Sequence, residues 1–518
     1  ASPSTMAFPG TQLLSNLRPK NAEATVLLTW VSLFLGELRD GLTMINMQSI
    51  YLLIAKKYTE TQVGVLFFVF GMSQFLFQAP AGYIMDYTHK KTAVLSGVAV
   101  GTTLCTICTA IFATEEGGNL GLMIFIKFIQ GGLTALIPTG LNSITQGIVG
   151  SVGMTSQVSV NEMMNHMGTS IIVIIASVIA YFKYQDDNQD IGIMFIVSPL
   201  ACIGTVLFLT RIRPEHIDHD AARGLTTSSE TPDFIPSASE VGATKLNETD
   251  PPPSSPIVKP SFNIGFGQVP TNNATGQPQA ALTPLEVIKD PILVTFTSIC
   301  FLFHMANGCI LPLVMQTLAI GNGKTGILMS GLCIVVAQLC MVVAAKTCGD
   351  YSGKFGRKIL FLIGLFIVSL RCLIILGLLH LRDVFPSTLV EGLILSTQIF
   401  DGVGAGIFGT MYILVTSDIS GGSGRFSMTL GITSAAMSIG GTVSGYLGEY
   451  LADEFGYNKA FLTLGALSLI PAFLYLLAMP ETLPDYARTS IATNPSRQCS
   501  KMQSIEEVED GDNGATPY

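Results

Sequence analysis

The sequence has few charged residues for its length. Of its 518 residues only 12% are charged, whereas 49% are hydrophobic; soluble domains carry about 25% charged residues. A soluble chain of this length would fold as several domains, each with a charged surface. The composition therefore excludes a soluble protein and indicates one that is buried in a bilayer.

Other absences exclude further classes. Ten cysteines in 518 residues are too sparse for a disulfide scaffold. There are 36 acidic and 27 basic residues, and no basic patch suited to nucleic acid. The single tryptophan, Trp30, provides no obvious aromatic cage for a sugar. Because the sequence has no phosphate-binding loop, no Ser–His–Asp arrangement and no metal-ligand cluster, we expect neither an enzyme nor a cofactor nor a metal.

Long apolar runs are abundant, and each is long enough to cross a bilayer as a helix. A helix needs about 20 apolar residues to do so, which excludes the shorter alternating strands of a membrane β-barrel. The runs number twelve and predict an all-α membrane protein with twelve transmembrane helices in two pseudo-symmetric six-helix bundles. The predicted spans are 26–54, 61–84, 92–113, 120–145, 157–182, 191–211, 292–319, 325–347, 358–380, 386–416, 426–452 and 459–479.

A polar stretch divides the runs into six and six. Residues 214–290 hold 11 of the 25 prolines and no tryptophan or tyrosine, so they are too poor in apolar side chains to fold alone. We expect a disordered cytoplasmic linker there. The domain prediction is thus an N-terminal segment (1–25), an N-terminal bundle (26–213), the linker (214–290), a C-terminal bundle (291–480) and an acidic tail (481–518).

Basic residues near the span ends predict the orientation. If both termini are cytoplasmic, the inner flanks hold eleven Lys and Arg and the outer flanks six. Cytoplasmic loops carry the excess of such residues. We therefore expect both termini inside the cell and the plasma membrane as the location.

A repeated loop links the two halves. The loop after the second span reads Gly82-Tyr-Ile-Met-Asp86-Tyr-Thr-His-Lys90-Lys91, and the loop after the eighth reads Gly349-Asp350-Tyr-Ser-Gly-Lys-Phe-Gly356-Arg357-Lys358. Internal similarity at a half-chain offset is typical of transporters built from repeats. We predict a cytoplasmic gate in which carboxylate–cation contacts form in one state and separate in the other; the alternative is that these cations serve topology alone. The gate prediction comprises Gly82, Asp86, Lys90, Lys91, Gly349, Asp350, Gly356, Arg357 and Lys358.

This pattern resembles motif A of the major facilitator superfamily, G-x-x-x-D-R-x-G-R-K. Departures are Tyr87 and His89 in the first copy and Gly353 at the aspartate position of the second. Lys127-Phe-Ile-Gln130-Gly131 is similar to the family's R-x-x-Q-G motif, whereas the antiporter Gly-Pro signature is absent from span 5. Segments of spans 1, 7 and 10 look like those of poorly characterised bacterial and fungal permeases of the superfamily. The resemblance implies that spans 1, 4, 7 and 10 line a central cavity.

Ionisable residues inside the spans each need a reason, because a charge at the bilayer centre costs about 3 kcal/mol or more. Four cavity-lining spans carry them, and polar amides accompany them. By helical periodicity Glu37 and Asp40 share a face while Arg39 points elsewhere. Arg371 lies on span 9, which is peripheral in such a fold, so we expect a structural or snorkelling role for it. The predicted substrate or coupling residues are Glu37, Arg39, Asp40, Lys127, Gln130, Glu162, His166, His304, Asn307, Gln316 and Asp401.

Two interpretations of these charges stay open. Glu162 and His166 are four residues apart and stack on one helix face, which suits either a proton relay or a structural tie to a neighbouring helix. Asp40 and Asp401 are the leading candidates for proton carriers, with Glu37 and Glu162 behind them; alternatively these carboxylates pair with Arg39 or Lys127 to fix helix packing.

Glycines mark close packing of helices. The run Asp401-Gly-Val-Gly-Ala-Gly406 has no preceding strand, so it is not a dinucleotide fingerprint. We expect close helix contacts there, and also at Gly441 and Gly445.

The functional prediction is a secondary active transporter that works by alternating access, coupled to protons, for a small polar or amphipathic organic solute. A non-transporting receptor that keeps the fold and an uncoupled facilitator are the alternatives. We expect a monomer whose partners are the solute, protons and the lipid bilayer.

Overall fold

A computed structural model describes residues 19–41, 48, 51–183, 192–225, 281–319, 323–382 and 384–483. These residues form helices and connecting loops, without a β-strand among them. The elements are α1 (Pro19–Asp40), η2 (Tyr51–Ala55), α3 (Glu60–Tyr87), α4 (Lys91–Phe112), η3 (Glu115–Gly117), α5 (Leu120–Thr134), α6 (Leu136–Lys183), η4 (Gly192–Ile196), α7 (Val197–Arg211), η5 (Pro214–His216), α8 (His219–Ala222), α9 (Pro284–Ile288), α10 (Pro291–Asn307), α11 (Ile310–Ala319), α12 (Gly323–Phe355), α13 (Arg357–His380), α14 (Ser387–Ser396), α15 (Gln398–Ser420), α16 (Phe426–Phe455) and α17 (Tyr457–Ala478).

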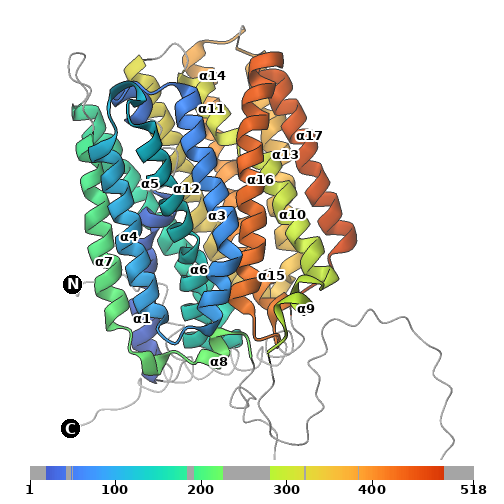
Figure 1. Ribbon diagram of the computed structural model, residues 1–518. Helices are drawn as coiled ribbons and strands as arrows, with labels where there is room; N and C mark the ends of the chain where they lie inside the picture. The colour runs from blue at the N-terminus through green and yellow to red at the C-terminus, as the bar shows by residue number, and fades with distance from the viewer. Residues whose placement is uncertain are drawn as a thin grey trace, which may run out of the picture.

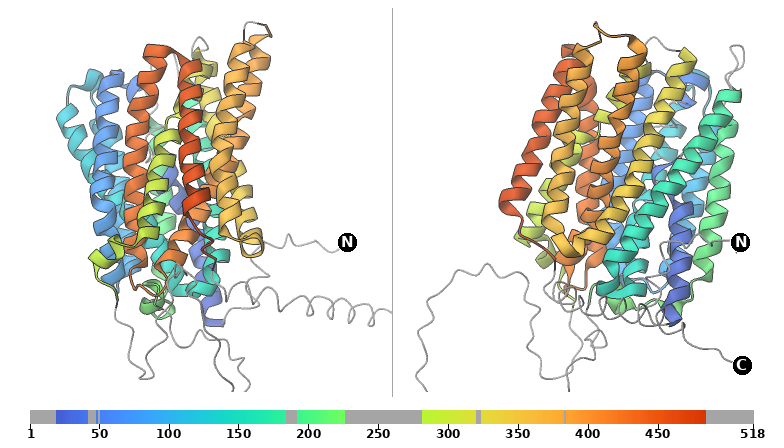
Figure 2. Two further views of the ribbon diagram at one scale, coloured as in Figure 1. Left: turned by 90° about the vertical axis from the view of Figure 1, so that its right-hand side faces the viewer. Right: turned by 180° about the vertical axis from the view of Figure 1, so that it is seen from behind.

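The helices stand side by side in two bundles, α1 to α7 in one and α10 to α17 in the other (Figures 1 and 2). Ten helical segments of the described residues are long and apolar enough to cross a membrane. The predicted first and eleventh spans correspond to α1 and α16, which are long helices with more polar sequences. The prediction of an all-α membrane protein with two six-helix bundles is confirmed.

Local sequence signals set several helix boundaries. Thr59 and Gln62 form a capping box at the start of α3, and the Asp290 carboxylate accepts from the backbone N–H of Ile292 ahead of α10. Gly150 takes a positive φ of 66° inside α6. That break separates the segments Leu120–Ser151 and Gly153–Ile179, the fourth and fifth spans.

The two halves meet along the helix pairs α3–α16 and α6–α12. A Cβ added at Gly82 would clash with the backbone of Ser427, and one added at Gly349 would clash with Ser159. Both positions are in the repeated loops, so the bundle is closed between its halves at the end that carries residues 82–91 and 349–358. We call this the loop end.

Glycine packing confirms one prediction and corrects another. Gly402 and Gly406 lie tightly against α12, as expected for span 10. Among the described residues a Cβ at Gly441 or Gly445 would have no neighbour within 4 Å, so these two do not pack against any of the described helices. The close contacts of α16 instead come from residues that the spacing did not single out, among them Gly440 against α10, because the spacing fixes a face of the helix but not which face meets a partner.

The apolar cores of the halves differ. In the C-terminal half one cluster of buried side chains runs from α10 to α17, and it extends to Met154 and Val158 of α6. In the N-terminal half the core is in two parts, one around Tyr51, Met123 and Phe195 and the other around Leu28 and Ile144. Buried polar side chains lie between these parts, including Glu37, Lys127 and Gln130.

The ends of the predicted linker are folded. Residues 214–225 contain η5 and α8, and residues 281–290 contain α9; all lie at the loop end (Figure 1). The Asp218 N–H donates to Gly147 O at 2.8 Å, which anchors α8 to the N-terminal half. The linker prediction is therefore too wide at both ends, because capping and backbone contacts order these stretches without a core of their own. Its centre lies outside the described residues, as do the tail from 484 onward and most of the segment 1–25.

Candidate functional site

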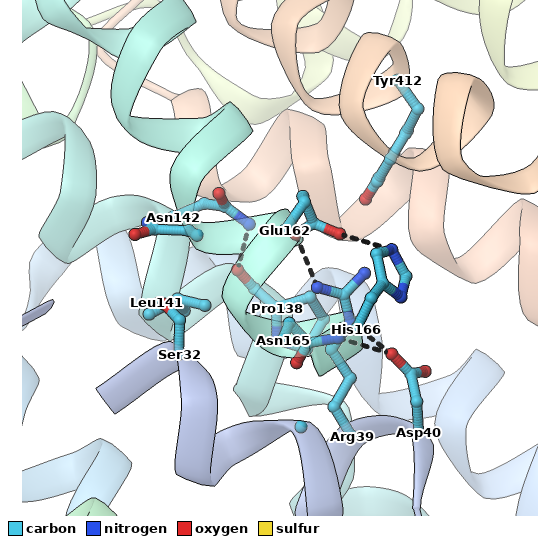
Figure 3. A network of polar contacts seen from close by, with 12 residues as sticks. Ser32, Arg39, Asp40, Pro138, Leu141, Asn142, Glu162, Asn165, His166 and Tyr412 are labelled. Carbon is cyan, nitrogen blue, oxygen red and sulfur yellow. Dashed lines mark hydrogen bonds and ion pairs between the residues drawn. The ribbon is translucent and has the colours of Figure 1, made fainter. Parts of the chain in front are cut away.

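Buried ionisable side chains meet at the boundary between the halves. Arg39 and Asp40 at the end of α1 approach Glu162, Asn165 and His166 on α6 (Figure 3). We call these five residues the interface cluster. Glu162, Asn165 and His166 are 1%, 0% and 6% exposed, so the part of the cluster on α6 is removed from solvent. The side chains of Arg39 and Asp40 are 20% and 30% exposed.

The guanidinium of Arg39 organises the cluster. Its Nη1 donates to Glu162 Oε1 at 2.6 Å, and its Nε lies 3.6 Å from Asp40 Oδ2. Asn165 Nδ2 donates to the same Asp40 oxygen at 2.8 Å. A buried charge needs a partner and hydrogen bonds to be tolerated, and Arg39 supplies both to the buried Glu162.

The cluster reaches across to the C-terminal half. His166 Nδ1 lies 2.7 Å from Gln338 Oε1 on α12, so this nitrogen carries hydrogen and donates. A Cβ at Gly409 on α15 would lie 3.7 Å from Glu162 Oε2. The Tyr412 ring lies on the same side, with its hydroxyl directed toward the cluster (Figure 3).

Two atoms of the cluster face each other without a hydrogen bond. Glu162 Oε2 and His166 Nε2 are 3.9 Å apart, and neither has a hydrogen-bond partner among the described residues. The predicted stacking of this pair on one face of the helix is confirmed. With Nδ1 engaged by Gln338, a neutral His166 presents a lone pair at Nε2 to a carboxylate oxygen. The pair is therefore a place where a proton would be held.

Glu37 does not join the cluster. Its Oε1 accepts from the Ser198 hydroxyl on α7 at 2.6 Å. The prediction that Glu37 and Asp40 share a face while Arg39 points elsewhere is wrong. Asp40 is the last residue of α1 and turns toward α6, and the long side chain of Arg39 bends to the same side.

Lys127 and Gln130 lie inside the N-terminal half. Lys127 Nζ donates to Gln48, to Thr109 Oγ1 at 3.0 Å and to Gln130 Oε1 at 2.8 Å. Gln130 in turn donates to Thr106 on α4 at 2.9 Å. The three N–H donors of the ammonium thus each meet an acceptor oxygen, and these contacts connect α4, α5 and Gln48.

Asp401 is paired within the C-terminal half. It accepts from Arg371 Nη1, while Arg371 Nη2 donates to Gln398 Oε1 at 2.8 Å. Arg371 is 1% exposed, so it does not snorkel. Arg371 points inward from α13 toward α15. The salt bridge that the sequence analysis gave as an alternative role for Asp401 therefore forms with Arg371, and not with Arg39 or Lys127.

The other predicted residues of the C-terminal half are dispersed. His304 Nδ1 approaches Cys300 O, and its ring packs edge-on against Phe408. Asn307 ends α10, and its Oδ1 has no hydrogen-bond partner among the described residues. Gln316 donates to Glu449 Oε1 at 2.7 Å. None of these contacts connects with the interface cluster.

The first repeated loop closes on the opposite half through Asp86. Its two carboxylate oxygens each accept at 3.0 Å from the backbone N–H groups of Ser427 and Met428, at the start of α16. A carboxylate at a helix N-terminus is favourable because it meets unsatisfied donors and the positive end of the helix dipole. Lys91 folds back to Met85 O, and Lys90 is exposed.

The second repeated loop closes through Arg357. Its Nε donates to Asp418 Oδ2 at 3.0 Å, its Nη1 to Ser352 Oγ at 2.7 Å, and its Nη2 to Thr155 Oγ1 of the opposite half at 2.8 Å. Asp350 is not the carboxylate of this gate; it forms an exposed pair with Lys346.

Glu481 completes this loop. It accepts from the backbone N–H groups of Arg357 and Lys358 at 2.8 and 3.2 Å. It thus caps α13 much as Asp86 caps α16. Gly356 has a φ of 86° and lies against this carboxylate, which a Cβ would strike.

Both ends of the predicted linker form hydrogen bonds with one loop, residues 421–425, between α15 and α16. Gly422 N donates to Gly224 O at 2.8 Å, and Leu282 N donates to Ser423 O at 2.9 Å. Arg425 Nε donates to Leu282 O at 2.9 Å, and its guanidinium lies 4.8 Å from the centre of the Tyr87 ring. We call this arrangement the linker clasp; it joins the first repeated loop to the C-terminal half.

Several functional positions escaped the sequence. Gln338 and Gly409 are uncharged residues of apolar helices, and no periodicity marks them as facing Glu162. Asp418 lies just past the predicted end of span 10, where a charge is ordinary. A search of the span ends for carboxylates that could pair with the cations of the repeated loops would have found Asp418 and Glu481.

Comparisons with known proteins agree with this architecture. The family model described as Major Facilitator Superfamily matches residues 29–385 and 293–502. Uncharacterised MFS-type transporters of two strains of Mycobacterium tuberculosis, CDC 1551 / Oshkosh and ATCC 25618 / H37Rv, are 29% identical over 471 residues, which is 91% of this chain and 96% of each relative.

A solved structure has the same fold. The proton:xylose symporter XylE, bound to 6-bromo-6-deoxy-D-glucose, superposes with a TM-score of 0.61 at 13% identity, over 89% of this chain and 96% of that one. Paired six-helix bundles, repeated loops that close one end, and a family match over most of the chain agree, and this multi-pass membrane protein belongs to the transporters of the major facilitator superfamily.

Proposed function

We propose that the chain is a secondary active transporter in which proton binding at Glu162 and His166 is coupled to the movement of a small polar or amphipathic organic solute. The observation that carries the proposal is the buried Glu162–His166 pair, 3.9 Å apart at the boundary of the halves, with facing atoms that lack hydrogen-bond partners among the described residues. Its position means that any separation of α6 from α12 and α15 changes its surroundings.

Alternating access requires the halves to rock around a central site. The loop end is closed by Asp86 and Arg357 across the halves, whereas nearer the other end a Cβ at Gly64, Gly441 or Gly445 would have no neighbour within 4 Å in the part of the chain that the structure describes. The excess of cations at the loop end supports a cytoplasmic location for it. In this proposal the structure is the form closed toward the cytoplasm, in a monomer of the plasma membrane.

The interface cluster shifts the proposed coupling role away from Asp401. A proton carrier must change its access when the halves move, and Asp401 is held by Arg371 within one half. Glu162 and His166 lie where that change occurs, with Arg39 and Asp40 beside them to tune their charge.

The test is transport by the purified protein in sealed vesicles. The vesicles carry an imposed pH gradient and are incubated with a defined mixture of polar and amphipathic solutes, and their contents are read by mass spectrometry. We expect at least one solute to accumulate against its gradient, and a protonophore to abolish the accumulation. Equilibration regardless of the pH gradient would indicate a facilitator, and no movement of any solute would favour the receptor alternative.

A further inference from the structure

The interface cluster has more hydrogen-bond acceptors than donors. Arg39 donates a hydrogen bond to Glu162 Oε1, and Asn165 donates one to Asp40. Three acceptor atoms have no hydrogen-bond partner among the described residues: Glu162 Oε2, Asn165 Oδ1 and His166 Nε2. Buried acceptors without donors are costly, so such atoms in a native structure require a reason. A ligand that brings donors would provide one.

The residue of α15 that faces Glu162 Oε2 is a glycine. A Cβ at Gly409 would lie 3.7 Å from Glu162 Oε2, which is ordinary van der Waals distance and no clash. Gly409 has no side chain to donate a hydrogen bond, and the hydroxyl of Tyr412, one turn further along α15, is bonded to Ser434. Neither residue of α15 therefore supplies the missing donor.

The charge balance indicates which kind of donor is missing. Arg39 contributes one positive charge, and Asp40 and Glu162 contribute two negative charges; with neutral His166 the sum is −1. A cationic donor would neutralise this excess, whereas an anionic ligand would add to it in a medium where charge repulsion is strong. A protonated amine fits both requirements, because it carries one positive charge and up to three N–H donors.

We propose that Glu162 Oε2 and His166 Nε2, with Gly409 opposite, form a binding site for the protonated amine of the transported solute, and that the substrate class is organic amines. The inference rests on the proposed transport function. The groups that face Glu162 are Arg39 and Asp40 from α1, His166 on its own helix, neutral Gln338 from α12, and Gly409 and Tyr412 from α15. Since the carboxylate holds either a proton or an ammonium group, the two compete and exchange across the membrane.

The experiment uses ligands that share a skeleton and differ only in the end group. One series is 2-phenylethylamine, 2-phenylethanol and phenylacetate, and a second is hexylamine, hexanol and hexanoate. The midpoint of thermal unfolding of the purified full chain is measured against concentration of each, because a ligand that binds the folded state raises it. We expect the amines to raise the midpoint more than the matched alcohols and carboxylates do, and less so as the pH falls.

Variants locate the effect. Glu162→Gln is expected to weaken the apparent affinity for the amines about tenfold or more, since it removes the charge and replaces one acceptor oxygen by an amide donor. Gly409→Ser places a hydroxyl donor against Glu162 and should weaken the amines in the same way. Gly409→Ala adds only a methyl group at contact distance and should weaken them less. Gly377→Ser is the control, because Gly377 has no neighbour within 4 Å of an added Cβ.

Two results would overturn the inference. One is a rise in the unfolding midpoint with the alcohols or carboxylates that equals or exceeds the rise with the amines. A midpoint that no ligand changes counts as the same result. The other is amine binding that is unchanged in both Glu162→Gln and Gly409→Ser. If solutes other than amines accumulate in vesicles in a gradient-dependent way, the amine-binding site fails and the transport function stands. If amines bind through Glu162 but nothing is transported, the amine-binding site stands and the transport function fails.

Discussion

In the N-terminal half, buried polar side chains divide the apolar core into two clusters; in the C-terminal half, one core runs from α10 to α17. The first arrangement holds Glu37, Lys127 and Gln130 inside the bundle and places Glu162 at its surface toward the other half. The second surrounds the pair Arg371–Asp401. A charge in the membrane is therefore not by itself a functional site; in the proposed mechanism, its position relative to the boundary between the halves decides.

Glu162 and Asp401 make the contrast sharpest. Both are buried carboxylates paired with an arginine from another helix. The partners of Asp401 all lie in its own half and move with it. Glu162 has one oxygen bound to Arg39 and the other facing Gly409 across the boundary. Substitutions at these two positions distinguish a carboxylate that couples proton movement to transport from one that only stabilises the fold.

The largest effect is expected from Glu162→Gln. The amide keeps the size of the side chain but neither titrates nor carries charge, so solute accumulation driven by a pH gradient should be lost, at least a hundredfold below wild type, as expected when a required proton step is removed. Equilibrium exchange of solute across the vesicle membrane should remain at solute concentrations high enough to saturate the weakened binding site. Initial rates in vesicles, with and without the pH gradient, measure both.

Asp401→Asn is the matched control for that experiment. It should keep gradient-driven accumulation once the amount of folded protein is equalised, because Asp401 sits within one half. Loss of coupling in Asp401→Asn together with normal coupling in Glu162→Gln would reverse the roles assigned to the two carboxylates.

The next effect is on stability. Arg371→Met leaves the Asp401 carboxylate buried without its cation, and removing one partner of a buried pair costs about 3–5 kcal/mol. The double variant Arg371→Met/Asp401→Leu should recover most of that loss, since apolar side chains can replace a buried pair. Thermal unfolding in detergent compares the three proteins. A double variant as unstable as the single one would show that the pair is not the unit of stability.

Much of this architecture is predictable from the sequence, and the limits are physical. Long apolar runs and repeated loops identify the spans and the halves because the bilayer fixes helix length. The i,i+4 rule places Glu162 and His166 together within one helix. The rotation of a helix that is apolar on all sides has no such signal, so the sequence reveals neither the pairing of Arg371 with Asp401 nor the position of Gly409.

The gate should give a smaller effect, on the balance between conformations. Asp86→Asn weakens two hydrogen bonds to the start of α16, which to a charged acceptor contribute about 1.5–3 kcal/mol each. We expect a larger population open at the loop end, with slower transport and normal membrane insertion. The measurement is the labelling rate of a cysteine introduced at Ser427, compared with and without the Asp86→Asn substitution. If labelling rates and transport rates are equal with and without Asp86→Asn, the first repeated loop sets the membrane orientation only and is not a gate.

The smallest effect is expected at the linker clasp. Arg425 donates to Leu282 O and stacks on the Tyr87 ring, so it connects the linker end, the loop 421–425 and the first repeated loop. Arg425→Gln keeps a hydrogen-bond donor and loses the cation over the ring, a contact of about 0.5–1 kcal/mol at a partly exposed site. Because the contact with Tyr87 joins the two halves at the closed loop end, its loss should raise the population open at that end by a few-fold, about 1 kcal/mol corresponding to a factor of five. The labelling rate of the same cysteine at position 427 measures this population. Lys459→Gln is the control, because it removes a comparable cation over the Phe455 ring elsewhere in the molecule. A labelling rate for Arg425→Gln that equals the control would mean that the clasp follows gate closure without stabilising it.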